Sequence, residues 1–481
     1  MIKLALPTGD LRAPTAELLS GVGLNVEGYG EGSRLYRLRV AGQEEVRIRV
    51  FRERDIPMQV ALGNYDIGIT SLAWVAEMQA RFPQQPLVPL GDLRIGQSAI
   101  FAAIAPSTDI GQGGSALSAR GGVGTAGKII RVASEYPNLA EAFARASRFP
   151  RYRVQAVAGA AEAYPPEDAD VAIITARDEA AIRGHGLEPI HHLLNTSAGL
   201  IANADSLAAK DLSLVLSRLQ SATAATANGA LHLPSPVTVS ADRPSPAKRQ
   251  RGESEDPLRL AIPDGHQQRH VFGALAKAGI AFDGYDEKTY VRRPTSTIDG
   301  LEVKVIRPQD MPQLIAFGEF DIAITGRDLL LEHTFAFPST PAMEVLDLQV
   351  SQYNLSAVVD GNLPADNIAD AMAYWRAQGR ESLIVAAEFP ATADHYARSR
   401  HFWRYRVIPI AGASEGFVPE DADVLIEGTE TGRTIAENNL KVLDNMYRST
   451  TCLIARKDAR LTGKRKSTYD EIFGALQESV A

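Results

Sequence analysis

An internal repeat is the feature of this sequence that most restricts how the chain can fold. The segment Leu4–Gly9 (LALPTG) recurs as Leu260–Gly265 (LAIPDG), 256 residues later. The segment Asp66–Thr70 (DIGIT) recurs as DIAIT 255 residues later, and Ala158–Glu162 (AGAAE) recurs as AGASE 253 residues later. Because the spacing changes by only three residues over the whole length, we infer that one domain has been duplicated with few insertions.

The repeat divides the chain into two copies and a linker. We predict copy one at residues 1–226 and copy two at residues 257–481. Residues 227–256 are rich in Ala, Ser, Thr and Pro and show no sustained hydrophobic period, so they cannot bury a face. We therefore predict a flexible linker there, and we interpret Lys248–Arg251 within it as a solvated charge cluster.

Strand patterns and helix patterns alternate within each copy. In copy one we expect strands at Leu4–Leu6, Glu45–Phe51 and Asp66–Thr70, and helices at Ala13–Leu19 and Ile56–Leu62. This alternation predicts an α/β fold with crossover connections of the parallel type.

Composition and charge exclude several classes of protein. A chain of 481 residues with 45% apolar residues can bury more than one core. Its net charge of −8 argues against general binding of nucleic acids. The apolar runs are too short to span a membrane, and the N-terminus enters a strand without a signal-peptide pattern, so we expect a cytoplasmic protein. The single Cys452 rules out an internal disulfide, and we expect it in a core.

Residues 421–440 are typical of a site for a phosphorylated sugar. The apolar run Val424–Ile426 predicts a buried strand ending at Glu427, after which Thr431–Thr434 opens a helix. Backbone N–H groups at a helix start, together with threonine hydroxyls and a close-approaching glycine, form a cradle for an anion. Glu427 and Glu430 suit ribose hydroxyls or a magnesium ion instead.

The corresponding loop of copy one has lost these features. Ile174 occupies the position of Glu427, and Asp178 and Glu179 replace the threonine and glycine of the turn. Two acids therefore stand where a phosphate would bind, although the strand before them is intact. A lone turn of this composition is more often a solvated turn, but its selective loss in copy one favours a binding site in copy two.

The loop in copy two resembles the phosphoribosyl-pyrophosphate loop of ATP phosphoribosyltransferase, the first enzyme of histidine biosynthesis. The resemblance rests on the acid–strand–acid order, on the Thr-Gly-x-Thr turn, on a short helix ending in Asn438, and on the upstream segments Ala261–Gly265, Asp321–Gly326 and Ala411–Glu415. It covers nearly all of the chain outside the linker. It implies two lobes per copy, similar to type II periplasmic binding proteins, with second lobes at about 98–188 and 351–440 and a ligand cleft between lobes.

The resemblance also implies an activity and a set of site residues. Copy two would join N1 of ATP to C1 of the ribose, with loss of pyrophosphate. The residues implied for phosphoribosyl pyrophosphate are Glu427, Thr429, Glu430, Thr431, Gly432, Arg433 and Thr434. The candidates for nucleotide binding are Gly265, Gly326, Glu415, Arg12 and Arg54. Magnesium is expected on the pyrophosphate, with Glu427 and Glu430 as the candidate protein ligands.

Neither copy matches the family pattern completely. The family's first loop is similar to Pro-Lys-Gly-Arg-Leu; copy one has Pro7–Leu11 (PTGDL), and copy two has Pro263–Gln267 (PDGHQ), which lacks both basic residues. After Ala455 we expect only about two helical turns and a tail, so the family's usual C-terminal regulatory domain is not expected.

These departures leave alternatives open. We expect the copies to dock as an intramolecular pseudo-dimer, in which copy one either lends Arg12 or Arg54 to the cleft of copy two or only supports folding. A higher oligomer or a separate regulatory subunit is also open. The alternative to an enzyme is a non-catalytic ligand-binding or regulatory protein with the same two-lobed fold.

Overall fold

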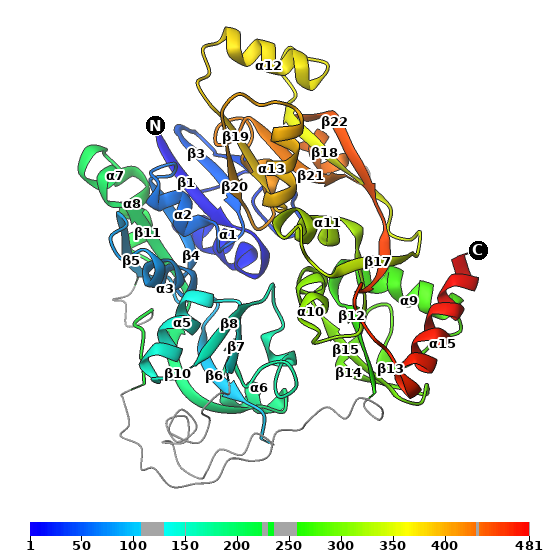
Figure 1. Ribbon diagram of the computed structural model, residues 1–481. Helices are drawn as coiled ribbons and strands as arrows, with labels where there is room; N and C mark the ends of the chain where they lie inside the picture. Colours follow the sequence, from blue (N-terminus) through cyan, green and yellow to red (C-terminus); the bar gives the residue numbers. More distant parts are fainter. Residues whose placement is uncertain (107–128, 150, 224–228, 235–256, 430–431, 481) are drawn as a thin grey trace.

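The computed structural model describes residues 1–106, 129–149, 151–223, 229–234, 257–429 and 432–480 (Figure 1). Its helices and strands form two halves of the same topology, and each half has two mixed α/β lobes. The five elements expected at the start of copy one are confirmed with small changes at their ends: β1 (Ile2–Pro7), α1 (Arg12–Gly21), β3 (Gln43–Phe51), α2 (Ile56–Ala61) and β4 (Ile67–Ser71).

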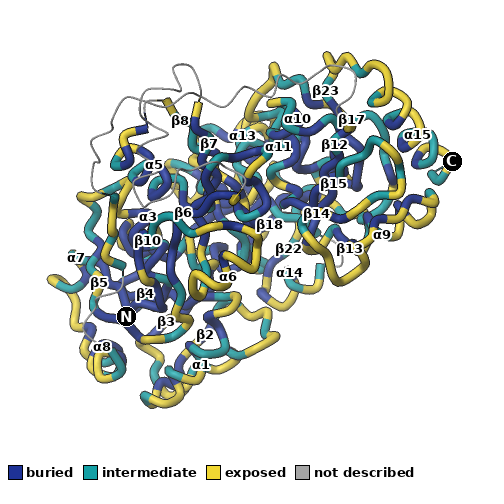
Figure 2. The backbone as a smooth tube through the Cα atoms, turned by 90° about the horizontal axis from the view of Figure 1, so that it is seen from below, coloured by how far each residue is buried: buried dark blue, intermediate teal, exposed yellow. Residues whose placement is uncertain are grey.

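The first lobe of copy one is a six-stranded sheet with the order β2-β3-β1-β4-β11-β5. The remaining strands are β2 (Arg37–Val40), β5 (Leu87–Asp92) and β11 (Ala198–Asn203). β1 pairs in parallel with β3 and β4, as crossover helices require, whereas β11 is antiparallel to β4 because the chain returns there from the second lobe. In Figure 2 the buried stretches follow the central strands, and the exposed stretches follow outer helices and turns.

The second lobe of copy one is a five-stranded sheet with the order β10-β6-β9-β7-β8. Its strands are β6 (Ser98–Ile104), β7 (Ile130–Ser134), β8 (Tyr152–Ala156), β9 (Val171–Ala176) and β10 (Glu188–Thr196). Helix α5 (Pro137–Ala146) connects β7 to β8 and buries its apolar face against the sheet.

Copy two repeats both sheets. Its first lobe has the order β15-β12-β16-β23-β17, with strands β12 (Leu258–Pro263), β15 (Leu301–Ile306), β16 (Ile322–Gly326), β17 (Ala342–Asp347) and β23 (Thr451–Arg456). A two-stranded ribbon of β13 (Phe282–Tyr285) and β14 (Tyr290–Ser296) lies beside it. Its second lobe has the order β20-β19-β21-β18-β22, with strands β18 (Tyr353–Asp360), β19 (Leu383–Ala387), β20 (Tyr405–Pro409), β21 (Val424–Thr429) and β22 (Leu440–Ser449).

Each second lobe ends later than the segment expected from the sequence. The expected ends were at about residues 188 and 440, but β10 continues to Thr196 and β22 to Ser449. Both strands pair antiparallel along the edge of their sheet, β10 with β6 and β22 with β18, before the chain returns to the first lobe. The edge pairing satisfies backbone groups that would otherwise be left open, which extends the lobe.

In each copy, a glutamate of the first lobe connects the two lobes. Glu77 of helix α3 (Leu72–Arg81) accepts hydrogen bonds from the backbone N–H groups of Asn138 and Leu139, each at 2.9 Å. In copy two, Glu332 of helix α11 (Arg327–Ala336) accepts the corresponding bonds at the start of helix α13 (Pro390–Ser399), at 2.9 and 2.8 Å. A carboxylate at a helix N-terminus satisfies open N–H donors, so these contacts fix how one lobe is set on the other.

The two copies pack crosswise, with the first lobe of each copy against the second lobe of the other (Figure 1). Phe51 of copy one stacks edge-on against Phe417 of copy two, with ring centroids 4.8 Å apart. On the other side, Tyr164 of copy one shares a hydrophobic cluster with Ile306 and Leu314 of copy two. We call these two contact regions junction A (first lobe of copy one with second lobe of copy two) and junction B (second lobe of copy one with first lobe of copy two).

Equivalent residues form the hydrogen bonds of the two junctions. At junction A, Asp55 accepts a bond of 2.8 Å from the Ala411 N–H, and at junction B, Asp310 accepts a bond of 3.0 Å from the Ala158 N–H. These residues are related by the repeat, so the copies are arranged about an approximate twofold axis, as in a symmetric dimer.

The C-terminal expectation was wrong. Instead of about two turns, the structure has an 18-residue helix, α15 (Gly463–Val480), that packs against the first lobe of copy two. Ile472 and Leu476 lie one turn apart on its buried face, so packing against the first lobe of copy two stabilises the helix.

Three further expectations concern the linker, the cysteine and membrane spans. Most of the expected linker lies outside the described residues, but Gly229 and His232 within 229–234 donate backbone hydrogen bonds to β10 of copy one. Cys452 is fully buried in β23. Among the described residues, no helix is long and apolar enough to cross a membrane.

Candidate functional site

The predicted anion-binding turn of copy two, which we call the phosphate loop (residues 427–434), connects β21 to a short helix. Helix α14 (Arg433–Glu437) begins two residues later than expected, and Gly432 occupies its N-cap position with a φ of +68°. A glycine adopts this left-handed conformation without the steric cost that a side chain brings. Among the described residues, no atom beyond the chain neighbours lies within 4 Å of a Cβ atom placed at Gly432, so the space at this position is open. Glu430 and Thr431 lie outside the described residues.

Two side chains of the phosphate loop face away from an anion site. Thr429 donates its hydroxyl to the Asn354 carbonyl at 3.2 Å and lies 3.1 Å from the Ser356 hydroxyl. Arg433 extends into solvent and forms an ion pair of 2.7 Å with Glu437 of the same helix. Because Arg433 begins helix α14, its backbone N–H group is available at the turn.

Glu427 lies at the end of the buried part of β21 among other carboxylates. Its side chain accepts hydrogen bonds from the Ser414 hydroxyl and, at 3.0 Å, from the Gly428 N–H. Burial, together with the nearby carboxylates of Glu415 and Glu388, raises the pKa of Glu427 to about 8. At neutral pH Glu427 is therefore mainly protonated, and a neutral carboxyl group can both donate to and accept from a pair of neighbouring hydroxyls.

The positive charges around this carboxylate cluster come from copy one across junction A. Burial raises the pKa of Glu388, and Arg52 and Arg54 of copy one oppose that shift. Arg52 lies directly against Gly412, where a Cβ atom would be only 3.1 Å from its Nε atom. A glycine at this position therefore allows an arginine of copy one to lie on the backbone of copy two.

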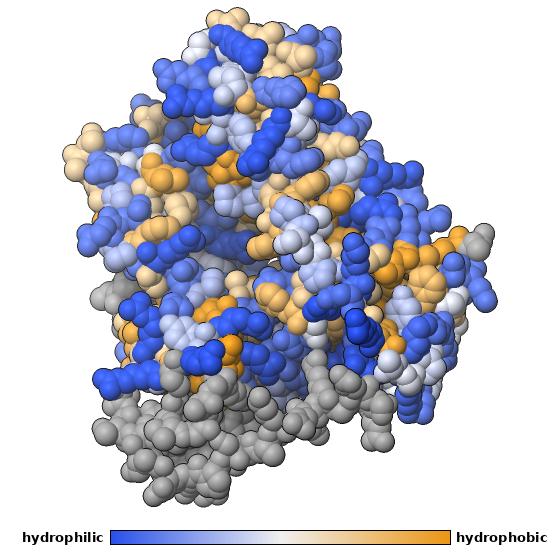
Figure 3. All heavy atoms as spheres, in the orientation of Figure 1, coloured by the Kyte–Doolittle hydropathy of each residue, from blue (hydrophilic) through white to orange (hydrophobic). Residues whose placement is uncertain are grey.

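Copy one also contacts the far end of α14. The Tyr36 N–H donates to Asn438 at 3.2 Å, and the Tyr36 phenol lies near Glu415 and Glu427, which help burial to raise its pKa. Figure 3 shows that the molecule is hollowed near the centre of the face it presents, and that hydrophilic residues surround the hollow.

The candidate nucleotide-binding residues lie in different parts of the structure. Glu415 and Arg54 lie at junction A, near the phosphate loop. Gly326 is the N-cap of α11, beside Asp328, whose charge also acts on Glu388. Gly265 lies at junction B, next to Arg307. Arg12 is buried in copy one, where its guanidinium donates to the Leu35 carbonyl at 3.2 Å and stacks over Tyr29.

Junction B, by contrast, is closed by ion pairs. Arg292 of copy two binds both Glu162 of copy one and Asp264, each at 2.8 Å, and Arg307 binds Asp264 at 3.2 Å. Glu162 is the repeat equivalent of Glu415, so the acid that is available at junction A is neutralised here.

The loop of copy one is also occupied by its own side chains. Ile174 is buried in the hydrophobic cluster at junction B, and Asp178 caps helix α6 (Glu179–Gly184) by accepting a bond of 2.9 Å from Ala181. Glu179 forms an ion pair with Arg183 at 2.9 Å. This loop therefore offers no open cradle for an anion.

Sequence reasoning missed several groups of junction A. Glu388 has an equivalent in copy one, Glu135, and this recurrence of a glutamate directly before an aromatic residue and a proline was a signal that could have found it. Copy two has Arg292 at the position of Tyr36, so internal comparison could not identify the tyrosine. Among the described residues, no group of three or more His, Cys, Asp and Glu side chains is arranged to bind a metal ion.

Comparison with known proteins gives a consistent assignment of both halves. The family model described as ATP phosphoribosyltransferase matches residues 52–221 and again residues 307–478. The ATP phosphoribosyltransferase of Mesorhizobium japonicum is 28% identical over 224 residues, which are 44% of this chain and 95% of that protein. The enzyme of the same name from Thermotoga maritima is 28% identical over 193 residues, 40% of this chain and 80% of that protein.

Solved structures with similar folds each align with about half of the chain. An ATP phosphoribosyl transferase complex from Thermotoga maritima aligns at 24% identity with a TM-score of 0.37, covering 46% of this chain and 97% of that chain. The alkanesulfonate-binding protein from Xanthomonas axonopodis aligns at 10% identity with a TM-score of 0.30, covering 47% of this chain and 73% of that chain.

Proposed function

Because this chain belongs to the ATP phosphoribosyltransferase family, we propose that its second copy transfers the phosphoribosyl group of phosphoribosyl pyrophosphate to N1 of ATP, with release of pyrophosphate. This reaction is the first step of histidine biosynthesis, and we expect it in the cytoplasm. The observation that carries the proposal is the difference between the two loops: copy two has an open turn at Gly432, whereas copy one has two acids in its place.

We assign the 5′-phosphate to the phosphate loop. Gly432 lets the substrate approach the backbone, and the N–H groups of Arg433 and Thr434 start helix α14 and point toward the turn. The Arg433 guanidinium is held by Glu437, so we propose that this residue acts through its backbone. Thr431, which lies outside the described residues, completes the turn in this proposal.

We assign the ribose to Glu427, together with Glu430, which is not described. A protonated Glu427 can donate to one hydroxyl and accept from its neighbour without adding a negative charge next to an anionic substrate. As the bond to pyrophosphate lengthens, positive charge develops on the ribose. The negative carboxylates of Glu388 and Glu415 then stabilise this charge. We therefore propose electrostatic stabilisation and positioning, with no proton transfer by a protein group to the reacting carbon.

We assign the pyrophosphate and nucleotide side of the site to charges from copy one. Arg52 and Arg54 are exposed cations of copy one whose charges act on Glu388, and they suit a leaving pyrophosphate or the ATP phosphates. Magnesium would enter bound to the pyrophosphate as part of the substrate, because the described residues form no metal-binding group and Glu427 is mainly protonated at neutral pH.

The test is to incubate the purified chain with ATP, phosphoribosyl pyrophosphate and magnesium and to follow pyrophosphate release together with formation of the phosphoribosyl nucleotide. Turnover that requires both substrates supports the proposal. Tight binding of either substrate without turnover would instead support a non-catalytic two-lobed binding protein.

A further inference from the structure

The side chain of Asn438 connects the phosphate loop of copy two to copy one. Its amide nitrogen donates to the Arg34 carbonyl of copy one at 3.1 Å and to the Thr434 carbonyl of helix α14 at 2.9 Å. Its amide oxygen accepts from the Tyr36 N–H of copy one at 3.2 Å. Only 4% of Asn438 is exposed, so water cannot readily replace these bonds.

The segment of copy one that Asn438 contacts is itself bonded to the rest of copy one. The Tyr36 carbonyl accepts a bond of 3.0 Å from the Val50 N–H of strand β3. The Leu35 carbonyl accepts the bond from Arg12, whose side chain is buried behind this segment. Residues 34–36 therefore form a segment that is hydrogen-bonded to the rest of copy one, and we call it the clamp segment. Asn438 forms hydrogen bonds with this segment on both sides of Leu35.

Helix α14 has few other stabilising contacts. It has only five residues, and an isolated helix of that length does not form in water. Its one buried residue is Ile435, and its N-terminal residue Arg433 extends into solvent. The bonds of Asn438 at its C-terminal end thus fix the helix relative to copy one, and the position of that helix determines where the N–H groups at Gly432 and Arg433 point.

The other half of the molecule lacks this connection. The repeat equivalent of Asn438 is His185, which is exposed after helix α6. The equivalents of Arg34 and Tyr36 are Tyr290, which is exposed, and Arg292, which instead forms ion pairs with Glu162 and Asp264. The link is therefore present only at junction A, where the loop has kept its anion-binding features.

We propose that Asn438 is a positioning residue for the phosphate loop, and that copy one fixes this loop through the clamp segment. The inference rests on the proposed function, since it assigns the role of the loop to binding phosphoribosyl pyrophosphate. It gives the first copy a task that requires no contact with substrate: residues 34–36 pre-organise the anion site of copy two through Asn438.

The test compares the full-length chain with Asn438→Ala and Asn438→Asp. Asn438→Asp keeps the acceptor for the Tyr36 N–H but loses the donor to Arg34 and Thr434, at the same side-chain size. The matched control is His185→Ala at the equivalent position of copy one. For each protein we would measure the KM for each substrate, kcat, the melting temperature, and hydrogen exchange of the backbone amides of residues 432–438.

We expect both Asn438 variants to raise the KM for phosphoribosyl pyrophosphate about tenfold while the KM for ATP stays within twofold, a loss of about 1.4 kcal/mol in binding of one substrate. Amide exchange in α14 should become faster, and His185→Ala should match the original protein in every measurement. Unchanged exchange and an unchanged KM for phosphoribosyl pyrophosphate would overturn the inference. So would a parallel loss of melting temperature and of binding for both substrates, because that pattern indicates general support of the fold.

Hydrogen exchange also separates this inference from the proposed function. If the original protein shows no turnover, the proposed function fails. Faster exchange in α14 of the Asn438 variants would still show that the clamp segment holds this helix in place through Asn438. If the original protein turns over normally and the variants do not differ from it, only the positioning role of Asn438 is refuted.

Discussion

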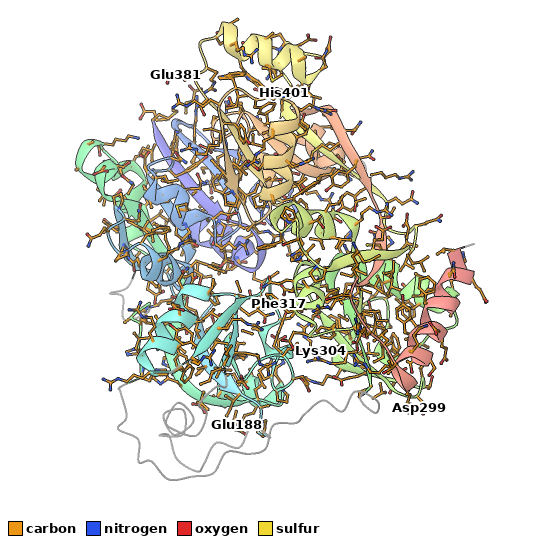
Figure 4. The ribbon with its side chains drawn as sticks, viewed as in Figure 1. Glu188, Asp299, Lys304, Phe317, Glu381 and His401 are labelled. Carbon is orange, nitrogen blue, oxygen red and sulfur yellow. The ribbon has the colours of Figure 1, made fainter. Side chains whose placement is uncertain are left out.

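Lys304, which is labelled in Figure 4, forms an ion pair with Asp168 across junction B, with 2.7 Å between Nζ and Oδ2 and only 1% of each side chain exposed. Lys304 also binds Glu167, and Asp168 also binds Arg259, so both charges are compensated in the interior. The repeat equivalents of Lys304 and Glu167 are Arg49 and Glu420, which form an ion pair at junction A with the glutamate side chain 34% exposed. The equivalent of Asp168 is Asp421, which accepts a hydrogen bond from the Tyr65 hydroxyl. The buried Lys304–Asp168 ion pair of junction B is therefore replaced at junction A by a hydrogen bond.

Replacing Lys304 by Met should destabilise the protein. The variant leaves Asp168 and Glu167 at junction B without one of their cations, and breaking a buried pair in this way costs about 3–5 kcal/mol. Arg49→Met at junction A should cost less, about 1 kcal/mol, since Glu420 can be solvated. Urea unfolding of the full chain would measure both effects. Equal midpoints for the two variants would contradict this account of the junctions.

Replacing Gly432 by Glu should abolish binding of phosphoribosyl pyrophosphate. Copy one carries Glu179 at this position, and a unit charge about 4 Å from a phosphate costs on the order of 4 kcal/mol at an effective dielectric of 20, or about three decades of affinity. Because φ is +68° at Gly432, any side chain there also brings strain of about 1–2 kcal/mol.

Gly432→Gln is the matched control, since it has the same strain without the charge. Titration calorimetry with phosphoribosyl pyrophosphate should show moderately weaker binding for Gln and no measurable binding for Glu. Glu179→Gly in copy one should leave binding unchanged. Normal turnover of the Gly432→Glu variant would disprove the assignment of the loop.

Glu427 should make stability depend on pH. Its pKa is about 8 in the folded protein, against a usual value of 4.5, so between these values the folded state holds a proton that the unfolded state has released. Stability must therefore fall as pH rises through this window. Glu427→Gln removes the effect, so its advantage over the original protein should grow from pH 5 to pH 8, to about 2–4 kcal/mol, at about 1.4 kcal/mol per pKa unit.

Thermal unfolding of both proteins at several pH values would measure this difference. The original protein should also bind phosphoribosyl pyrophosphate more weakly above pH 8, because ionised Glu427 then adds a negative charge beside an anion, and Glu427→Gln should not show this loss. A stability difference that stays constant from pH 5 to pH 9 would show that Glu427 has an ordinary pKa.

Arg54→Ala should impair substrate binding in copy two although Arg54 belongs to copy one. A lost hydrogen bond to a charged group is worth about 1.5–3 kcal/mol, so we expect the KM for ATP to rise by about one to two decades. The equivalent residue of copy two is Gln309, which is likewise exposed, and Gln309→Ala should have no effect. If the two variants behave alike, copy one does not contribute Arg54 to the site.

The sequence by itself determined the repeated α/β fold and the difference between the two loops. Both depend on local patterns: the alternation of apolar residues placed strands such as β1 and β3, and the loss of the turn glycine at Glu179 was visible by comparing one copy with the other. The length of α15 was missed because the helix is stabilised by Ile472 and Leu476 against another element.

Only the tertiary structure decided which lobe faces which loop. The bonds from residues 34–36 to Asn438 join positions about 400 apart in the chain, and no local pattern encodes a contact of that range. The pKa of Glu427 likewise depends on burial and on Glu415 and Glu388, which come together only when β19 and β21 lie in one sheet. The sequence specifies the type of each side chain. The electrostatic field at that side chain and its exposure to solvent depend on the residues that pack around it in the folded protein.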